Sequence, residues 1–201
     1  MPWPRMRASI QAMVPMDDAE WETFCSYIRP RRLAKKEHLF THGQVVKWVG
    51  FVNEGCLRYY LLDNAAEERI IYFAMEGWWI GDLGSFNHGQ PTLNNLQALT
   101  DVELLLLERD GFEEMCARCP AWEKFYRLAT QKAYAAIQDR YIQFQAMSAE
   151  EKYLWLVKKS PTLFQRVPQH YIASYLGIQP QSLSRIRKKL AVEGPDAPDP
   201  A

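Results

Sequence analysis

The chain has 201 residues, of which 48% are apolar and 13% aromatic, a composition that excludes a disordered protein and can fill one large or two small domains. It has no run of 18 apolar residues and no apolar stretch behind its first charges, which excludes a membrane helix and a secretion signal, so we expect a cytoplasmic protein. The formal net charge is zero, but residues 148–194 carry eight Lys or Arg against three acidic residues, as expected of a phosphate-binding module.

The chain is expected to begin with a flexible segment over residues 1–16, followed by a helix at residues 17–28. Trp21, Phe24, Cys25 and Ile28 fall on one face of this helix, and acidic residues occupy its first turn, where the helix dipole favours them. It is predicted to be a short entry helix that packs its apolar face on the domain that follows.

Residues 29–108 change to short β-rich runs separated by turn signals such as His42-Gly43 and Glu76-Gly77. No helical pattern lies between the runs, so they are predicted to pair as antiparallel strands rather than as βαβ units. Strands this short need closure, because an open sheet would leave exposed edges. The sequence thus predicts an α+β fold whose residues 17–120 form an antiparallel β-roll, of the double-stranded β-helix or jelly-roll type. The runs are RRLAK, HLFTHGQ, WVGFVNEG, CLRYYLLD, ERIIYFAM, WWIGDL, LQALT and VELLLLE.

A long helix is predicted at residues 121–147, after a short helix at 110–118. Apolar or small residues recur along it every three or four positions and make a continuous stripe of about five turns. Such a stripe suits a core helix or the seam of a dimer, and alanines at its middle allow two helices to approach closely. The stripe consists of Tyr126, Ala129, Ala133, Ile137, Tyr141 and Phe144.

A capping box marks a domain boundary, because Ser148 at the N-cap and Glu151 at the third helical position satisfy each other's backbone amides. The helix that follows, residues 150–159, is expected to bury Tyr153, Leu154, Leu156 and Val157 against the rest of a domain of residues 148–192. Residues 193–201 are rich in Pro, Gly and Asp and are predicted to be a disordered tail.

The segment from Val167 to Leu190, VPQHYIASYLGIQPQSLSRIRKKL, reads as two short helices joined by a tight turn. Gly177 can adopt the positive φ that the turn requires, and Pro180 suits the first position of the second helix. The apolar residues that would close a shared core are Ile172, Leu176, Ile178, Leu183 and Ile186, with the small Ala173 between them.

The outward face of the second helix combines amides and guanidinium groups that can read bases with cations and hydroxyls that can bind phosphates. A solvated face of a small helical bundle is the alternative interpretation, but the register of the apolar positions, the alanine and the glycine favours DNA. A recognition helix needs a partner to reach a second half-site, so we expect a homodimer on a palindromic operator. The predicted DNA-binding residues are Gln179, Gln181, Ser182, Ser184, Arg185, Arg187, Lys188 and Lys189.

The segment from Ser148 to Leu190 resembles the C-terminal part of Crp/Fnr-type transcription regulators, and most closely a short-winged branch found in Bacteroidetes. The resemblance implies a cyclic-nucleotide-binding type of β-roll, a dimerising helix, a helix-turn-helix and an interaction with RNA polymerase. Most of the family continues into a β-hairpin wing where this sequence has its Pro/Gly/Asp tail, so we expect no wing contacts to DNA.

Residues 80–90, IGDLGSFNHGQ, look like the phosphate-binding cassette of that family, in which a Gly–acid–Leu turn holds the ribose. Thr92 and Leu93 stand where the family has an arginine and a neighbouring hydroxyl. A buried phosphate without its arginine would lose on the order of a few kcal/mol, so we expect a structural turn that does not bind cyclic AMP in the usual way. Binding of an unrelated small ligand is the alternative interpretation. The matching residues are Gly81, Asp82, Leu83, Gly84, Thr92 and Leu93.

No cofactor or metal is predicted, and the effector is unknown. Cys116 and Cys119 have metal-ligand spacing but lack a second pair, and Cys25 alone cannot replace the clustered cysteines of an iron–sulfur site. The four histidines are scattered along the sequence, and a role of one of them as a haem ligand is an alternative that the sequence leaves. No motif of a hydrolase, P-loop or dinucleotide site occurs, so an enzyme is not expected. The rival to a DNA-binding regulator is a β-roll binding module whose helix-turn-helix contacts protein instead of DNA.

Overall fold

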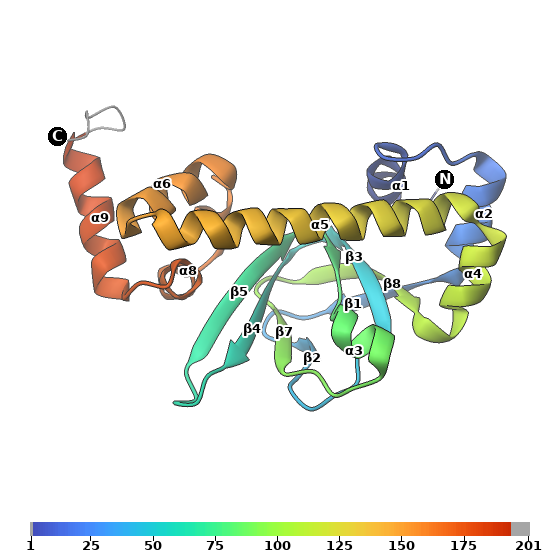
Figure 1. The fold of residues 1–201 in the computed structure, drawn as a ribbon, viewed down its shortest axis with the longest axis horizontal. Coiled ribbons are helices and arrows are strands. Elements are labelled where there is room, and N and C mark those ends of the chain that lie inside the picture. The colour runs from blue at the N-terminus through green and yellow to red at the C-terminus, as the bar shows by residue number, and fades with distance from the viewer. Residues whose placement is uncertain (1, 194–201) are drawn as a thin grey trace.

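The computed structural model describes residues 2–193, in which eight strands form two four-stranded antiparallel sheets beneath one long helix (Figure 1). One sheet has the order β1-β8-β3-β6 and the other β2-β7-β4-β5. The predicted antiparallel β-roll is thereby confirmed, and each predicted run overlaps a strand. The strands are β1 Ile28–Leu33, β2 His38–Phe40, β3 Trp48–Glu54, β4 Cys56–Leu62, β5 Glu68–Met75, β6 Trp79–Ile80, β7 Asn94–Ala98 and β8 Val102–Glu108.

The two sheets enclose a dry core made of side chains from facing strands. Val52, Leu57, Leu96 and Leu104 are all fully buried there. The chain turns tightly between β3 and β4 at Gly55, whose φ is 101°, and a Cβ there would lie 2.5 Å from a backbone oxygen. Only glycine fits such a corner, so this position fixes how the chain passes from one sheet to the other.

The prediction of a flexible N-terminus was wrong for the part that the structure describes. Residues Pro4–Gln11 form helix α1, and Met6, Ile10 and Val14 are buried at a spacing of four residues against α2, Asp18–Tyr27. An isolated helix of this length would be marginal in water. It is stabilised here because its apolar face completes the cluster around Trp21 and Phe24 of α2, and the roll therefore begins earlier than expected.

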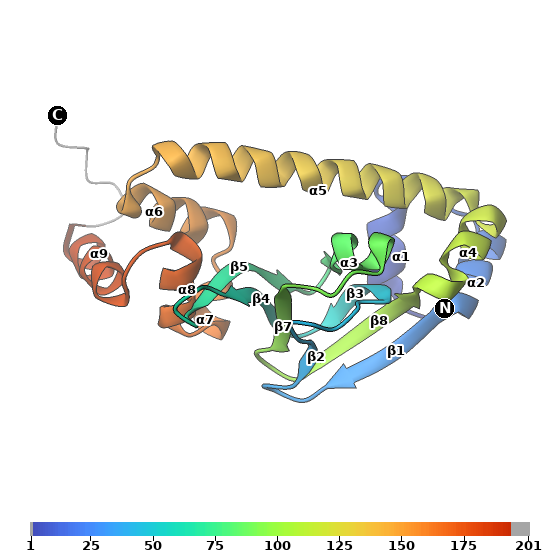
Figure 2. The same ribbon diagram turned by 60° about the horizontal axis from the view of Figure 1, so that its bottom comes forward.

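The helices that follow the roll lead into one helix that runs the length of the molecule above the sheets (Figure 2). Its first turns are anchored by the buried rings of Trp122 and Phe125, whereas residues 131–139 are exposed on every side. A helix whose middle has no cover within its own chain is typical of an interface. The elements after the roll are a 3-10 turn at Arg109–Gly111, α4 Phe112–Arg118 and α5 Pro120–Ala146, whereas α3 Leu83–His88 lies within the roll, between β6 and β7.

The C-terminal helices confirm the predicted capping box and the two-helix motif. The Ser148 side chain accepts the Glu151 amide, and the Glu151 side chain accepts the Ser148 amide. Leu154 was expected to be buried but is 40% exposed, because only Leu156 of this helix points fully into the core. Glu193, assigned to the tail, ends the last helix, and residues 194–201 lie outside the described residues. The helices are α6 Ala149–Lys159, α7 Leu163–Arg166, α8 Gln169–Leu176 and α9 Pro180–Glu193.

The C-terminal helices do not form a separate core, because they share one with the outer face of strands β4 and β5. Tyr60, Ile70 and Phe73 of the roll are buried in the same cluster as Ile172 and Leu176 of α8. Burial of each such side chain contributes about 1.5–3 kcal/mol. The boundary at residue 148 therefore separates two segments of the chain that fold against one another.

Polar contacts fix the position of α7 and α8 on this sheet. Arg166 forms two hydrogen bonds with the Glu76 carboxylate, at 2.7 and 2.9 Å. The Ser174 hydroxyl donates to the Glu68 carbonyl at 2.8 Å and accepts the Ile70 amide at 3.1 Å. These bonds occupy backbone groups at the edge of β5, so α8 covers that edge.

Arg58 of β4 is held between the two parts of the chain. Its guanidinium lies over the ring of Tyr60 at 4.2 Å and over the ring of Tyr171, from α8, at 4.1 Å. It is also paired with the carboxylate of Glu68 and donates to Gln97 at 2.7 Å. These directional contacts of the buried Arg58 help to fix how α8 is oriented on the roll.

We predict that Arg166→Ala lowers the free energy of unfolding by about 1–3 kcal/mol, because the charge-assisted bonds to Glu76 are lost. Hydrogen exchange should show faster exchange of the α7 and α8 amides. Arg69→Ala is the matched control, since Arg69 pairs with Asp63 and Glu67 on a hairpin where it is 51% exposed. Arg69→Ala should lower the free energy of unfolding by less than about 1 kcal/mol. Equal effects of the two substitutions would contradict a docking role for Arg166.

The ion pair between Arg166 and Glu76 makes the stability of the protein depend on pH. The hydrogen bonds from Arg166 lower the pKa of Glu76 from 4.5 to about 2. Its contribution to stability is therefore fully present above pH 4.5 and is lost as the pH falls from there toward 2. In the Arg166→Ala protein the free energy of unfolding, measured by denaturant titration at several pH values, should fall less over this pH range.

Candidate DNA interface and effector cleft

The turn between α8 and α9 has the tight geometry that the sequence predicts. Gly177 ends α8 with a φ of 70°, and the Ile178 amide donates to the Ala173 carbonyl at 3.0 Å. The Gln179 carbonyl then accepts the amides of Ser182 and Leu183 as α9 begins. Backbone hydrogen bonds within a few residues therefore close the end of α8 and the start of α9.

The packing of this turn decides which face of α9 is exposed. Ile172, Ala173, Leu176 and Leu183 are fully buried between the two helices. Ile178 and Ile186, predicted for the same core, are half-buried. Because these residues occupy one side of α9, the opposite side lies free at the end of the molecule (Figure 1).

The exposed side of α9 brings together most of the predicted DNA-binding residues. Gln181, Ser184, Arg185 and Lys188 are exposed at spacings of three or four residues and so share one stripe of the helix. Gln179 is exposed in the turn before it. Arg185, Arg187 and Lys188 form no ion pair with any residue in the described part of the chain.

Two of the predicted residues lie elsewhere. Ser182 is half-buried at the flank of the helix. Lys189 pairs with Glu150 of α6 at 3.0 Å, so its ammonium group joins two helices of the same chain. The sequence pattern did not reveal this pair, because Glu150 is 39 residues away.

The predicted stripe of α5 divides into three parts. Its ends pack within the chain, Tyr126 on Phe112 at 4.8 Å between ring centres and Phe144 on Trp155 at 5.2 Å. Ala129 is half-buried against the core of the roll, while Ala133 is exposed. The exposed apolar side chains of the middle are Tyr134, Ile137, Tyr141 and Ile142, each 58–67% exposed.

The carboxylate of Asp82 is the centre of the cassette that the sequence indicates. One oxygen accepts the Ser85 amide at 3.0 Å and thereby caps α3, a helix that the sequence analysis missed. The other oxygen accepts the hydroxyls of Tyr59 and Thr92 and the amide of Asn94, at 2.5–3.1 Å. Gly81 precedes Asp82 in the chain, and Leu83 and Gly84 are the first two residues of α3.

These contacts satisfy Asp82 within the protein. Burial acts to raise its pKa, but the hydrogen bonds from the amide and the side chains outweigh burial and hold the pKa below its usual value. Thr92 is buried beside it, and Leu93 is 73% exposed. Neither of the two positions after the cassette therefore presents a cation to a phosphate.

A cleft of about 570 Å³ lies between the roll, α5 and the C-terminal helices. The sequence analysis did not find it, because its walls come from segments far apart in the chain. Tyr59, Tyr72 and Trp78 line it as a series of near-parallel rings, and Ala129, Ala133 and Arg140 of α5 close the opposite side.

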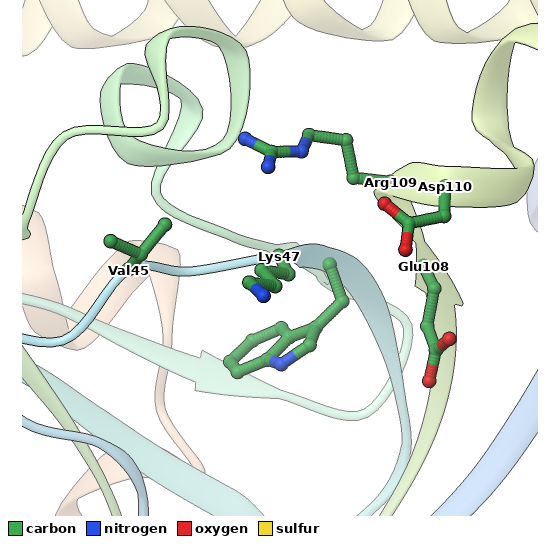
Figure 3. Close-up of a pocket in the computed structure, with 6 residues that line it drawn as sticks. Val45, Lys47, Glu108, Arg109 and Asp110 are labelled. Carbon is green, nitrogen blue, oxygen red and sulfur yellow. The ribbon is translucent and has the colours of Figure 1, made fainter.

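A smaller depression of about 250 Å³ lies at the end of β8 (Figure 3). It mixes two basic and two acidic side chains, and the Arg109 guanidinium turns away to the Phe86 carbonyl of α3 at 3.3 Å. No single ligand chemistry is favoured there. Its lining residues are Val45, Lys47, Trp48, Glu108, Arg109 and Asp110.

Metal-ligating and membrane-spanning features are absent from residues 2–193. No group of three or more His, Cys, Asp or Glu side chains there could hold a metal ion. Burial raises the pKa of the Cys116 thiol to about 11, which disfavours the thiolate that a metal needs. No helix in this part of the chain is both long and apolar enough to cross a bilayer.

Comparison with known proteins identifies relatives of this chain. Residues 30–119 match the profile of the cyclic nucleotide-binding domain. The chain is 24% identical over 119 residues to the cAMP-activated global transcriptional regulator CRP of Salmonella typhimurium, and equally to that of Escherichia coli O157:H7. Each match covers 59% of this chain and 56% of the relative, so the chain spans little more than half the length of these curated relatives.

Solved structures extend the similarity to the whole fold. FixK2 from Bradyrhizobium japonicum has a TM-score of 0.69 at 17% identity, covering 83% of this chain and 86% of its own. The c-di-GMP responsive global regulator CLP of Xanthomonas campestris has a TM-score of 0.70 at 16% identity, covering 89% and 93%. These comparisons do not test the closer resemblance to the Bacteroidetes branch. Residues 30–119 are therefore similar to the cyclic nucleotide-binding domain, and the chain shares its fold with FixK2 and CLP.

Proposed function

We propose that this protein is a dimeric transcription regulator that binds a palindromic DNA operator through α9. The observation that carries the proposal is the exposed stripe of Gln181, Ser184, Arg185 and Lys188, whose cations have no acidic partner among the described residues. Arginine and glutamine read base edges in the major groove, and lysine binds phosphates. The relatives' names describe transcriptional regulators, which supports the same conclusion. A regulator of this kind would contact RNA polymerase in the cytoplasm, and we include both in the proposal.

A dimer is supported by the middle of α5. Tyr134, Ile137 and Tyr141 recur at spacings of three and four residues, and each is more than half exposed. Exposed apolar side chains that form a continuous stripe are typical of an interface. A second copy packed along this stripe in a symmetric contact would present two α9 helices to two half-sites.

The rival function is a binding module whose α8 and α9 contact a protein. Salt dependence separates the two, because phosphate contacts release counterions and a protein contact of mixed polarity does not to the same degree. Binding to a palindromic duplex selected from random sequences, measured at several salt concentrations, tests the proposal directly.

We expect Arg185→Ala to weaken operator binding by about 1–3 kcal/mol per half-site and to relax the preference at one base pair, because a bidentate contact to guanine is lost. Fluorescence anisotropy with the operator and with single-base variants measures both effects. Gln181, one turn earlier, is expected to read a neighbouring base.

Lys188→Ala is the matched control on the same face. It should weaken binding to specific and random duplexes alike and reduce the salt slope by about one counterion per contact. If Arg185→Ala also weakens both duplexes equally, Arg185 binds only phosphate, and base reading passes to Gln181 and Gln179.

We predict that Ile137→Glu yields a monomer, because it places two like charges in a dry symmetric contact. Sedimentation velocity at micromolar concentration should show the change. Gln143→Glu adds the same charge to the opposite side of α5 and should remain a dimer. A dimeric Ile137→Glu protein would mean that the seam lies on another surface.

We predict that cyclic AMP and cyclic GMP do not bind at micromolar concentration. Thr92 and Leu93 occupy the positions of the expected arginine and hydroxyl, and the Asp82 carboxylate already accepts four hydrogen bonds. Isothermal titration calorimetry should show no saturable heat. A micromolar dissociation constant would instead show that another cation has replaced the arginine.

A further inference from the structure

Lys189 lies on the flank of α9, beside the stripe that is proposed to face DNA. It follows Lys188 directly, and a rotation of about 100° per residue places it at the edge of that stripe. Ser182, about two turns earlier, lies on the same flank. In a major groove the centre of a recognition helix reaches base edges, whereas its flanks pass close to the phosphates of the groove walls. The position of Lys189 therefore suits a phosphate contact.

The ammonium group of Lys189 is engaged within the chain by the carboxylate of Glu150. The distances from its Nζ to the two carboxylate oxygens are 3.0 and 3.2 Å. Helices α6 and α9 lie side by side at one end of the molecule (Figure 1), and Leu156 and Leu183 are buried in the cluster that they share. The packing of these apolar side chains brings the carboxylate to the ammonium group.

The start of α6 fixes the place of Glu150. The capping box of Ser148 and Glu151 sets the first turn of α6, and Glu150 lies within this turn, where the helix dipole stabilises a carboxylate. Between residues 148 and 192 the sequence has two acidic residues, Glu150 and Glu151. The Glu151 carboxylate accepts the Ser148 amide at 2.7 Å. Glu150 is thus the carboxylate of this segment that faces the recognition helix.

The ion pair is partly exposed to solvent, and this has two consequences. The side chains of Lys189 and Glu150 are 47% and 34% exposed. An exposed ion pair contributes little to stability, so its loss should leave the fold intact. The same exposure lets a DNA phosphate approach the pair, where it meets a cation that is already neutralised and a carboxylate of its own sign.

We propose that Glu150 takes the place of a DNA phosphate: it holds Lys189 in an ion pair and thereby limits the affinity of α9 for DNA. Lys189 then makes no phosphate contact in the complex, in contrast to Lys188, which forms no ion pair with any described residue. The carboxylate lowers binding to all sequences alike, because phosphate contacts carry no sequence information. This inference rests on the proposed binding of DNA by α9.

The test compares Glu150→Gln with the wild-type full-length protein by fluorescence anisotropy, on a random duplex and on the selected operator, at several salt concentrations. Without the carboxylate, the ammonium group of Lys189 can turn to a phosphate. Binding to both duplexes should tighten about two- to fivefold per chain. The dependence of the logarithm of the binding constant on the logarithm of the salt concentration should become steeper by about one counterion per chain.

Glu151→Gln is the matched control, because it removes the same charge one residue away and glutamine can keep the capping box. It should tighten binding less than Glu150→Gln and leave the salt slope unchanged. Lys189→Gln should also leave the wild-type salt slope unchanged, whereas Lys188→Ala reduces it. When Glu150→Gln is combined with Lys189→Gln, the slope should return to the wild-type value. Far-UV circular dichroism and the melting temperature establish that each variant is folded.

Three results would overturn the proposal. Weaker or unchanged DNA binding by Glu150→Gln would mean that the pair only braces α9 against α6. Equal effects of Glu150→Gln and Glu151→Gln would reduce the role of Glu150 to its share of the net charge. A lower salt slope of Lys189→Gln would mean that Lys189 already binds phosphate in the wild-type complex. In all three cases the wild-type protein still binds DNA, whereas a wild-type protein that binds no duplex contradicts the DNA-binding proposal and this inference with it.

Discussion

The arrangement of the whole molecule depends on the burial of one apolar sheet face beneath the C-terminal helices. Tyr60, Ile70 and Phe73 would form an exposed apolar patch on the roll without α8, and Leu176 would be exposed without the sheet. At about 1.5–3 kcal/mol for each side chain, this burial outweighs any single ion pair across the contact. The helix-turn-helix is therefore held in one place relative to the roll.

Hydrophobic burial has little direction, so polar groups must set the orientation of the two parts. Arg58 lies between rings from both sides, Ser174 bonds the backbone at β5, and Arg166 holds Glu76 in a bidentate pair. These contacts surround the apolar cluster rather than replace it. Together they join the roll directly to α7 and α8, and α9 follows α8 through the tight turn at Gly177.

Helix α5 presents two different surfaces along its exposed middle. The stripe through Tyr134, Ile137 and Tyr141 suits a second copy of the chain, and the adjacent face through Ala129, Ala133 and Arg140 closes the aromatic cleft. Ile137 belongs to both surfaces. A second copy packed on the stripe, as we propose, would thus lie at the rim of the cleft.

The sequence by itself determined the eight strands, the long helix, the capping box at Ser148 and the turn at Gly177, because each depends on neighbours within a few residues. It also indicated which side of α9 is exposed. Only the tertiary structure decided that residues 4–11 form a helix packed on the roll, that Phe144 packs inward, that Lys189 pairs with Glu150, and that a cleft lies beneath α5. These features join residues that are distant in the chain, and local periodicity carries no information about which distant surfaces will meet.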